Sequence, residues 1–172
     1  MSLAFVDIHC HLLPGIDDGA SDLAEALAMA EMAVADGIGT VVCTPHQLGN
    51  FAENTGDEIR TRVAGLQVQL NRAGIGLRVL PGGDVRIEDG LVAGLAAGRV
   101  LSLGDRGRHV LLELPHELYF PLEPVLAELK RRDMVGILSH PERNQGILSA
   151  PHVLGPLVEA GCLMQVTAGS RC

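Results

Sequence analysis

Residues 3–15 read LAFVDIHCHLLPG and carry the strongest structural signal in the chain. An apolar run enters Asp7-Ile8-His9-Cys10-His11, and Pro14-Gly15 follows, which is typical of a buried strand that ends in a turn. Side chains alternate across a strand, so Asp7, His9 and His11 are expected on one face. Two imidazoles one residue apart on one face can both reach a single cation. The stretch therefore indicates a metal site, and the alternative is a pair of buried, hydrogen-bonded histidines.

The composition of the 172 residues indicates a single α/β domain with an aliphatic core. Hydrophobic residues make up 47% of the chain, yet there is no Trp, one Tyr and three Phe. The formal net charge of −8 argues against nucleic acid as a partner, because a phosphate backbone binds basic surfaces. The charge does not argue against a phosphorylated substrate, because bound divalent cations reverse the local field of an acidic pocket.

The chain lacks the sequence signals of membrane insertion and secretion. No apolar run approaches the roughly 18 residues that span a bilayer, and the N-terminus shows no charged region with a cleavage site. The four cysteines form no Cys-x-x-Cys pair. We therefore expect a cytoplasmic protein with reduced thiols.

Hydrophobic periodicity divides the chain into alternating strands and helices. Continuous apolar runs predict strands, and amphipathic stretches that start at a capping residue and stop at Gly predict helices. This alternation predicts a parallel sheet covered by helices. The predicted strands are 4–9, 40–44, 77–80, 109–114, 135–139 and 162–167, and the predicted helices are 21–36, capped by Ser21 or Asp22, 55–73, 88–97, 121–132 and 150–160.

Polar side chains stand where these predicted strands end. Because the loops at the carboxyl ends of the strands converge on one mouth in α/β barrels, we expect these side chains to meet there. A site of imidazoles and carboxylates suits Mn, Fe or Zn better than Ca, and a carboxylate between histidines can bridge two ions. The residues concerned are His9, His11, Asp17, Asp18, His46, Asp84, Glu113 and His140.

Five motifs follow one another along the chain: DIHCH at 7–11, LLPGIDDG at 12–19, TPH at 44–46, LLELP at 111–115 and SHPERN at 139–144. In their order and spacing they resemble the PHP (polymerase and histidinol phosphatase) superfamily. More narrowly, they are similar to the bacterial manganese-dependent tyrosine phosphatases of capsule and exopolysaccharide loci. The resemblance implies a distorted PHP-type (β/α) barrel. It also implies a metal-dependent protein-tyrosine phosphatase whose substrate is a bacterial tyrosine-kinase tail.

The resemblance implies roles for individual side chains. It implies two or three divalent ions, which are Mn or, as alternatives, Fe, Zn or Mg. Glu113 would bridge ions, and Arg143 would bind the substrate phosphate through bidentate contacts. Asp84 stands where the family usually has Glu, so its carboxylate reaches one methylene less far. The implied metal ligands are His9, His11, Asp18, His46, Asp84, Glu113 and His140, and the implied catalytic residues are Arg143 and Glu113.

The C-terminal end departs from the resemblance. Family members continue into a seventh strand that ends in Asp-x-His, and no Asp-x-His follows residue 141 here. We therefore expect one incomplete PHP domain over residues 1–172, with about six of seven strands and without the C-terminal strand–helix unit. Association of several copies across the open side, a histidinol-phosphatase-like activity and a non-catalytic remnant stay open as alternatives.

Three further histidines are expected to have structural or surface positions. His109 begins a predicted strand, so it should lie at the end of the barrel opposite the site. His116 follows Glu113 and lies either in a surface loop or at the mouth. His152, at a helix start, is expected to be exposed to solvent.

Several charged residues also have structural interpretations. Asp7 is expected to orient an imidazole or to act as a buried partner, and Asp17 to shape its turn and cap the first helix. Arg86 would reach phosphate or form a surface salt bridge. Glu142 is expected to pair with Arg143.

Other hydrolytic chemistries lack their motifs. A thiol-based tyrosine phosphatase needs Cys-x5-Arg, and the sixth residues after Cys10, Cys43 and Cys162 are Ile, Gly and Ala. The chain contains no Gly-x4-Gly-Lys for nucleotide phosphates and no Gly-x-Ser-x-Gly for a serine nucleophile. Metal-assisted hydrolysis is the chemistry that the sequence supports.

Overall fold

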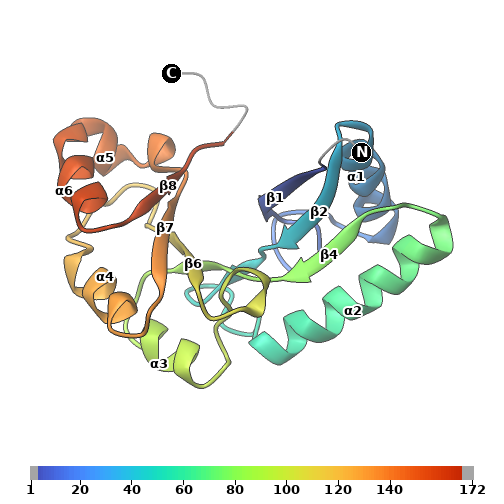
Figure 1. Cartoon of the computed structure of the whole chain (residues 1–172), viewed down its shortest axis with the longest axis horizontal. Coiled ribbons are helices and arrows are strands. Elements are labelled where there is room, and N and C mark those ends of the chain that lie inside the picture. The colour runs from blue at the N-terminus through green and yellow to red at the C-terminus, as the bar shows by residue number, and fades with distance from the viewer. Residues whose placement is uncertain (1–3, 168–172) are drawn as a thin grey trace.

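The computed structural model describes residues 4–167 and arranges their strands in two parallel sheets (Figure 1). The first sheet has the order β1-β2-β4, with β1 at Phe5–Cys10, β2 at Ile38–Cys43 and β4 at Arg78–Pro81. Helices α1 (Leu23–Ala35) and α2 (Gly56–Ala73) accompany it and supply aliphatic side chains to one core cluster. Members of that cluster include Ala26, Ala30, Val41, Ile59, Leu66, Leu70 and Val79.

Both long helices have the ends that their sequences predict. The carboxylate of Asp22 accepts a hydrogen bond from the backbone N–H of Glu25 and caps α1, as one of the two predicted capping residues. The hydroxyl of Thr55 accepts from the backbone N–H of Glu58 at the start of α2. Gly74 ends α2 with a φ of 72°, a left-handed conformation that glycine adopts without strain.

The second sheet has the order β3-β5-β6-β7-β8, and all its strand pairs are parallel. It carries the shorter helices, seen in the left half of Figure 1. Its strands are β3 (His46–Gln47), β5 (Asp84–Arg86), β6 (His109–Glu113), β7 (Val135–Ser139) and β8 (Leu163–Gln165). Its helices are α3 (Leu91–Ala96), α4 (Glu123–Lys130), α5 (Gln145–Ser149) and α6 (Leu154–Glu159), with 3-10 turns at Leu103–Asp105, Pro141–Arg143 and Pro151–Val153.

The chain crosses from the first sheet to the second at two adjacent points. Residues 44–45 join β2 to β3, and residues 82–83 join β4 to β5. The backbone N–H of Asp84 donates to the carbonyl of Pro45 at 3.0 Å, which ties the two crossings together. A Cβ at Gly82 would lie 2.7 Å from Cγ1 of Val42, so this crossing needs glycine. The crossings bring the carboxyl ends of β2 and β4 directly to the start of the second sheet.

The α/β class and the parallel pairing agree with the sequence prediction, while some details differ. All six predicted strands are present, and the very short β3 and β5 were not predicted. The helix predicted over 150–160 is present but shorter, because Pro151 starts a 3-10 turn and α6 begins only at Leu154. Within residues 4–167, β1 and β8 are edge strands of their sheets. No helix in this part of the chain is both long and apolar enough to cross a membrane.

Candidate metal centre

Polar side chains from six separate segments converge where the two sheets meet. They come from β1, from the loop after it, from the starts of β3 and β5, from the end of β6 and from the residue after β7. Each has a side-chain nitrogen or oxygen within 4 Å of another member's. We call this group the His/Asp/Glu cluster, and its members are the seven predicted ligands: His9, His11, Asp18, His46, Asp84, Glu113 and His140.

Asp84 lies at the middle of the cluster. Its Oδ2 is 3.4 Å from Nε2 of His9, 3.7 Å from Nε2 of His140 and 3.8 Å from Nδ1 of His46. The residue is fully buried, and neither carboxylate oxygen has a hydrogen-bond partner within residues 4–167. A buried carboxylate without hydrogen bonds is costly, so this arrangement calls for a cation. The shorter side chain of Asp, in place of Glu, still reaches three imidazole rings.

The spacings in the cluster fit shared coordination better than hydrogen bonding. Two donors that bind one ion at roughly 2.1 Å lie roughly 3–3.5 Å apart, which is close to the separations seen here. Three overlapping groups have ligand atoms within 4.8 Å of one another: His9, His11 and Asp84; His11, Asp18 and His46; and His46, Asp84 and Glu113. The sharing of side chains between these groups is suited to a centre with more than one ion.

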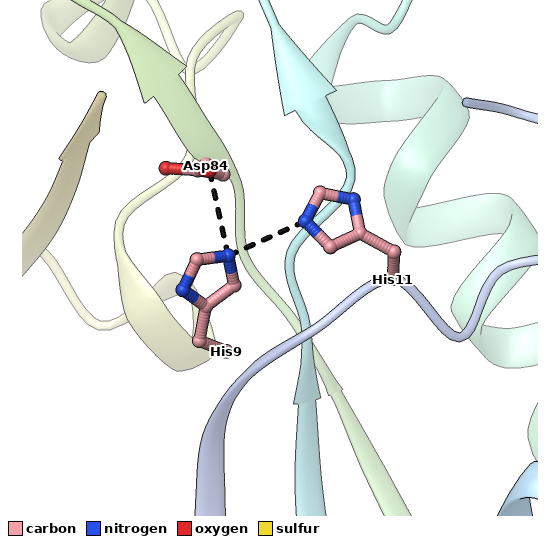
Figure 2. Close-up of side chains that lie close together, drawn as sticks. All are labelled: His9, His11 and Asp84. Carbon is pink, nitrogen blue, oxygen red and sulfur yellow. Dashed lines mark hydrogen bonds and ion pairs between the residues drawn. The ribbon is translucent and has the colours of Figure 1, made fainter. Parts of the chain in front are cut away.

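Two acceptors fix the imidazoles of His9, on β1, and His11, just after β1, so that their other ring nitrogens face each other. Nδ1 of His9 donates to Oε1 of Gln165 at 2.7 Å, and Nδ1 of His11 lies 2.7 Å from Oδ2 of Asp17. Nε2 of His9 then lies 3.3 Å from Nε2 of His11 (Figure 2). In the neutral rings both Nε2 atoms carry lone pairs, so the contact is favourable only with a proton on one ring or a cation between them.

Buried carboxylates dominate the electrostatics of the cluster. Burial alone would lower the pKa of His46, but Glu113, Asp84 and Asp18 outweigh burial and raise that pKa to about 9. For Asp84, burial raises the pKa, and the nearby imidazoles of His140 and His9 outweigh burial, so the net shift of the pKa is downward. The Asp84 carboxylate therefore stays ionised, and in the absence of metal the His46 ring carries a second proton and a positive charge. A cation bound at His46 must displace that proton.

The backbone around the cluster is shaped for these contacts. A Cβ at Gly19 would lie 2.1 Å from the carbonyl oxygen of His11, so only glycine lets the Asp17-Asp18-Gly19 turn pack against β1. His140 has a φ of 32° immediately before Pro141, a strained left-handed conformation for a non-glycine residue. Strain of this kind persists where surrounding contacts fix a functional side chain.

Asp17 and Asp7 act on the cluster from outside it. Besides its contact with His11, Asp17 accepts hydrogen bonds from the backbone N–H groups of Gly19 and His46. It therefore shapes its turn as predicted, but the prediction that it caps α1 is wrong, because Asp22 does so. Asp7 was expected to orient an imidazole or to be a buried partner. Its Oδ1 instead accepts from the backbone N–H of His9, and the residue is half-buried.

A large cavity opens beside the cluster between β1 and β8. Its volume is about 1020 Å³, and residues of both strands line it together with cluster members. Arg143 and His116 are exposed on its wall. The predicted phosphate-binding guanidinium therefore lies beside the cluster, and His116 lies at the mouth. His109 and His152 are exposed and do not line this cavity.

The remaining alternatives for charged residues are resolved in part. Oε1 of Glu142 accepts from the backbone N–H of Thr167 at 3.0 Å and so ties the turn after β7 to the end of β8. Arg86 forms no ion pair within residues 4–167, so the predicted surface salt bridge is wrong there. Its side chain instead lines a smaller cavity beside Glu113.

Sequence reasoning missed two glutamines that hold the site together. Gln165 ends β8, and the rule that polar residues at strand ends face the site would have found it. Gln47 is 1% exposed; its Nε2 donates to the carbonyls of Asn54 and Arg99, and its Oε1 accepts from the N–H of Leu101. Gln47 carries no pattern that distinguishes it from a surface residue in a sequence.

The thiols in the described part of the chain are unsuited to nucleophilic attack. Burial raises the pKa of Cys10 to about 12 and also raises the pKa of Cys43 and Cys162. All three are free thiols. Cys172 lies outside the described residues. This agrees with the absence of a Cys-x5-Arg motif.

Comparisons with known proteins identify relatives of this arrangement. The family model for capsular polysaccharide synthesis, CpsB/CapC, matches residues 5–171. The tyrosine-protein phosphatase YwqE of Bacillus subtilis is 38% identical over 167 residues, which cover 96% of this chain and 65% of YwqE. CapC of Staphylococcus aureus is 29% identical over 166 residues, again 96% of this chain and 65% of the relative.

A solved structure shares the fold as well. It comes from work on YwqE of Bacillus subtilis and CpsB of Streptococcus pneumoniae, described as unique metal-dependent tyrosine phosphatases. It superposes with a TM-score of 0.92 at 37% identity, covering 96% of this chain and 67% of that one. The chain thus spans about two thirds of the length of the relatives it matches, and its mixed α/β fold is theirs.

Proposed function

Because this chain belongs to the CpsB/CapC family of capsular polysaccharide synthesis, we propose that it is a metal-dependent protein-tyrosine phosphatase. The observation that carries the proposal is Asp84, a fully buried carboxylate that lies among three imidazoles and has no hydrogen-bond partner within residues 4–167. Its donor set fits divalent metal ions of the kind that metal-dependent phosphoesterases use.

We propose that the whole His/Asp/Glu cluster holds two or three divalent ions, with Mn as the first choice and Fe, Zn or Mg as the others. Imidazole and carboxylate donors suit these metals. Such ions, when bound, supply Lewis acidity and an activated water for attack on phosphorus. Asp84 and Glu113 are the bridging carboxylates in this proposal, because each approaches more than one imidazole.

The other residues position the substrate and the ligands. Arg143, exposed on the wall of the large cavity, binds phosphoryl oxygens and stabilises the charge that develops on them. Asp17 and Gln165 hold the imidazoles of His11 and His9 with their Nε2 atoms toward the cluster.

We also propose the finer features that accompany this activity. Parallel strands with ligands at their ends support a distorted PHP-type (β/α) barrel as the architecture of the full domain. A bacterial tyrosine-kinase tail as the substrate and a cytoplasmic location are further parts of the proposal, and the relatives named as tyrosine-protein phosphatases support a phosphotyrosine protein as the substrate. The exposed edge strands β1 and β8 support association of several copies.

The test is metal-dependent turnover by the purified chain. We expect calorimetric titration with Mn to show at least two bound ions, and a phosphotyrosine peptide to release phosphate faster than histidinol phosphate. His9→Ala should abolish turnover, whereas His109→Ala, a change at an exposed histidine away from the large cavity, should retain it. Preference for histidinol phosphate, or one weakly bound ion without turnover, would overturn the proposal.

A further inference from the structure

A second, smaller cavity adjoins the cluster. Its volume is about 130 Å³. His46 and Glu113 of the cluster line it together with Gln47, Leu48, Asn50, Phe51 and Arg86. None of the last three residues belongs to the metal-ligand set, so they need another explanation.

Arg86 lines this cavity, and its guanidinium has no partner in the described part of the chain. The side chain is half-buried and forms no hydrogen bond or ion pair with other residues of 4–167. Its neighbour across the sheet is Glu113, in register between β5 and β6, yet the Glu113 carboxylate contacts His46 and His140 instead. A half-buried guanidinium without a carboxylate is suited to an anionic ligand.

The loop 48–51 fixes the position of Arg86. A Cβ at Gly49 would lie 2.7 Å from Cδ of Arg86, so the glycine makes room for the arginine stem. Gly49 also has a φ of 54°, which glycine adopts without strain. The arginine is therefore packed in place rather than free to sweep the surface.

Phe51 presents an aromatic wall to the same cavity. Its ring stacks on the ring of His46, with centroids 5.2 Å apart and planes 24° apart. The backbone N–H of Phe51 donates to the carbonyl of Leu48 at 2.9 Å, and this tight turn holds the ring over the cluster. The cavity thus joins an aromatic face, a cation and two proposed metal ligands.

We propose that this cavity receives the aryl group of the substrate, with Phe51 packing against the tyrosyl ring and Arg86 donating to the phosphoryl oxygens. This inference rests on the proposed function and adds the residues that select tyrosine over serine. A protein cavity of roughly 150 Å³ binds benzene, so the volume here suits one ring. The larger cavity, at about 1020 Å³, has several times the volume that encloses a single ring. Ring-on-ring contacts favour phosphotyrosine over an alkyl phosphate of equal charge.

The test is binding of O-phosphotyrosine and O-phosphoserine to the Mn-loaded chain, measured by calorimetry. We expect phosphotyrosine to bind about tenfold more tightly. Phe51→Leu should remove most of this preference while leaving the phosphoserine affinity unchanged. Arg86→Met should weaken both ligands by about tenfold, because both present the same phosphoryl oxygens.

Matched variants make the test specific. Phe5→Leu changes an exposed phenylalanine at the larger cavity, and Arg78→Met changes an exposed arginine on β4, so neither should alter the preference. Mn affinity and thermal unfolding of each variant verify the metal centre and the fold. The inference is overturned if the wild type binds neither ligand, if it shows no preference, or if Phe5→Leu removes the preference and Phe51→Leu keeps it. Absence of turnover together with preserved aryl preference would reject the proposed function alone.

Discussion

The two sheets meet at two seams, and these differ sharply in how they are closed. At the inner seam, residues 44–47 and 81–84, the chain itself crosses between the sheets, and Gln47 and Asp84 are 1% and 0% exposed. At the outer seam β1 faces β8 across the large cavity, and Phe5 and Val166 are 71% and 55% exposed. Figure 1 shows the strands meeting at its centre and separating toward β1 and β8.

This difference shows how the cluster is organised. Ligands at the inner seam, His46 and Asp84, are set by chain continuity and by buried hydrogen bonds. At the outer seam, Nδ1 of the His9 imidazole is held by a side-chain contact with Gln165. The positions of His46 and Asp84 therefore follow from the chain crossings, whereas the orientation of the His9 ring depends on the position of β8.

The largest effect is expected from Asp84→Asn at the inner seam. The substitution keeps the shape of the side chain and removes the charge that three imidazoles and any bound ion share. Loss of one partner from a buried ionic group costs about 4 kcal/mol, so Mn affinity should fall on the order of 1,000-fold. Calorimetric titration measures this. Asp105→Asn, at a partly exposed ion pair with Arg60, is the control and should leave Mn affinity unchanged.

Gln47→Ala should destabilise the inner seam, and it changes none of the proposed metal ligands. It leaves three backbone groups, of Asn54, Arg99 and Leu101, without their side-chain partner in a buried setting. Each such group costs about 1–3 kcal/mol, so we expect about 3 kcal/mol lower unfolding free energy in urea. Gln145→Ala, at an exposed glutamine, should change it by less than about 0.5 kcal/mol. Equal values for the two variants would show that Gln47 does not hold the seam.

The sequence predicts the inner seam's ligands but not the means by which the seam is held. His46 and Asp84 each follow an apolar run. Because strand ends converge in α/β folds, the sequence alone predicts that both residues lie near His9. Gln47 gives no such signal, because its role depends on the carbonyl of Asn54, 7 positions along the chain, and on that of Arg99, 52 positions along the chain. The strands β3 and β5 cannot be predicted from hydrophobic periodicity, because strands of two and three residues are too short to show a period.

The outer seam is less predictable for a different reason. The alternation rule places Asp7 on the ligand face of β1, but its carboxylate turns to the backbone N–H of His9. The pairing of β1 with β2 shifts register between Asp7 and Cys10, and a local irregularity of this kind leaves no trace in composition or spacing. The alternation rule therefore predicts side-chain orientation least well on an edge strand such as β1.

Gln165→Ala, at the outer seam, should lower the metal affinity by less than Asp84→Asn does. Without the acceptor at 2.7 Å, the His9 ring loses its fixed orientation, and loss of such an outer contact reduces metal affinity by about tenfold. The unfolding free energy should change by less than about 1 kcal/mol, because the residue is half-buried on an edge strand. Gln165→Glu keeps an acceptor for Nδ1 and should retain the affinity. If Ala and Glu at this position behave alike, His9 is oriented by something other than this contact.

The smallest effect is expected from Val166→Ser, at the exposed residue that follows β8. Because the side chain is 55% exposed, its replacement should change the unfolding free energy by less than about 0.5 kcal/mol. Val85→Ser, at a fully buried valine of β5, should cost about 2–4 kcal/mol by contrast. Urea unfolding at several protein concentrations measures both. A loss for Val166→Ser that approaches the Val85→Ser value and grows with concentration would mean that a second copy covers the outer seam, since only association makes stability depend on concentration.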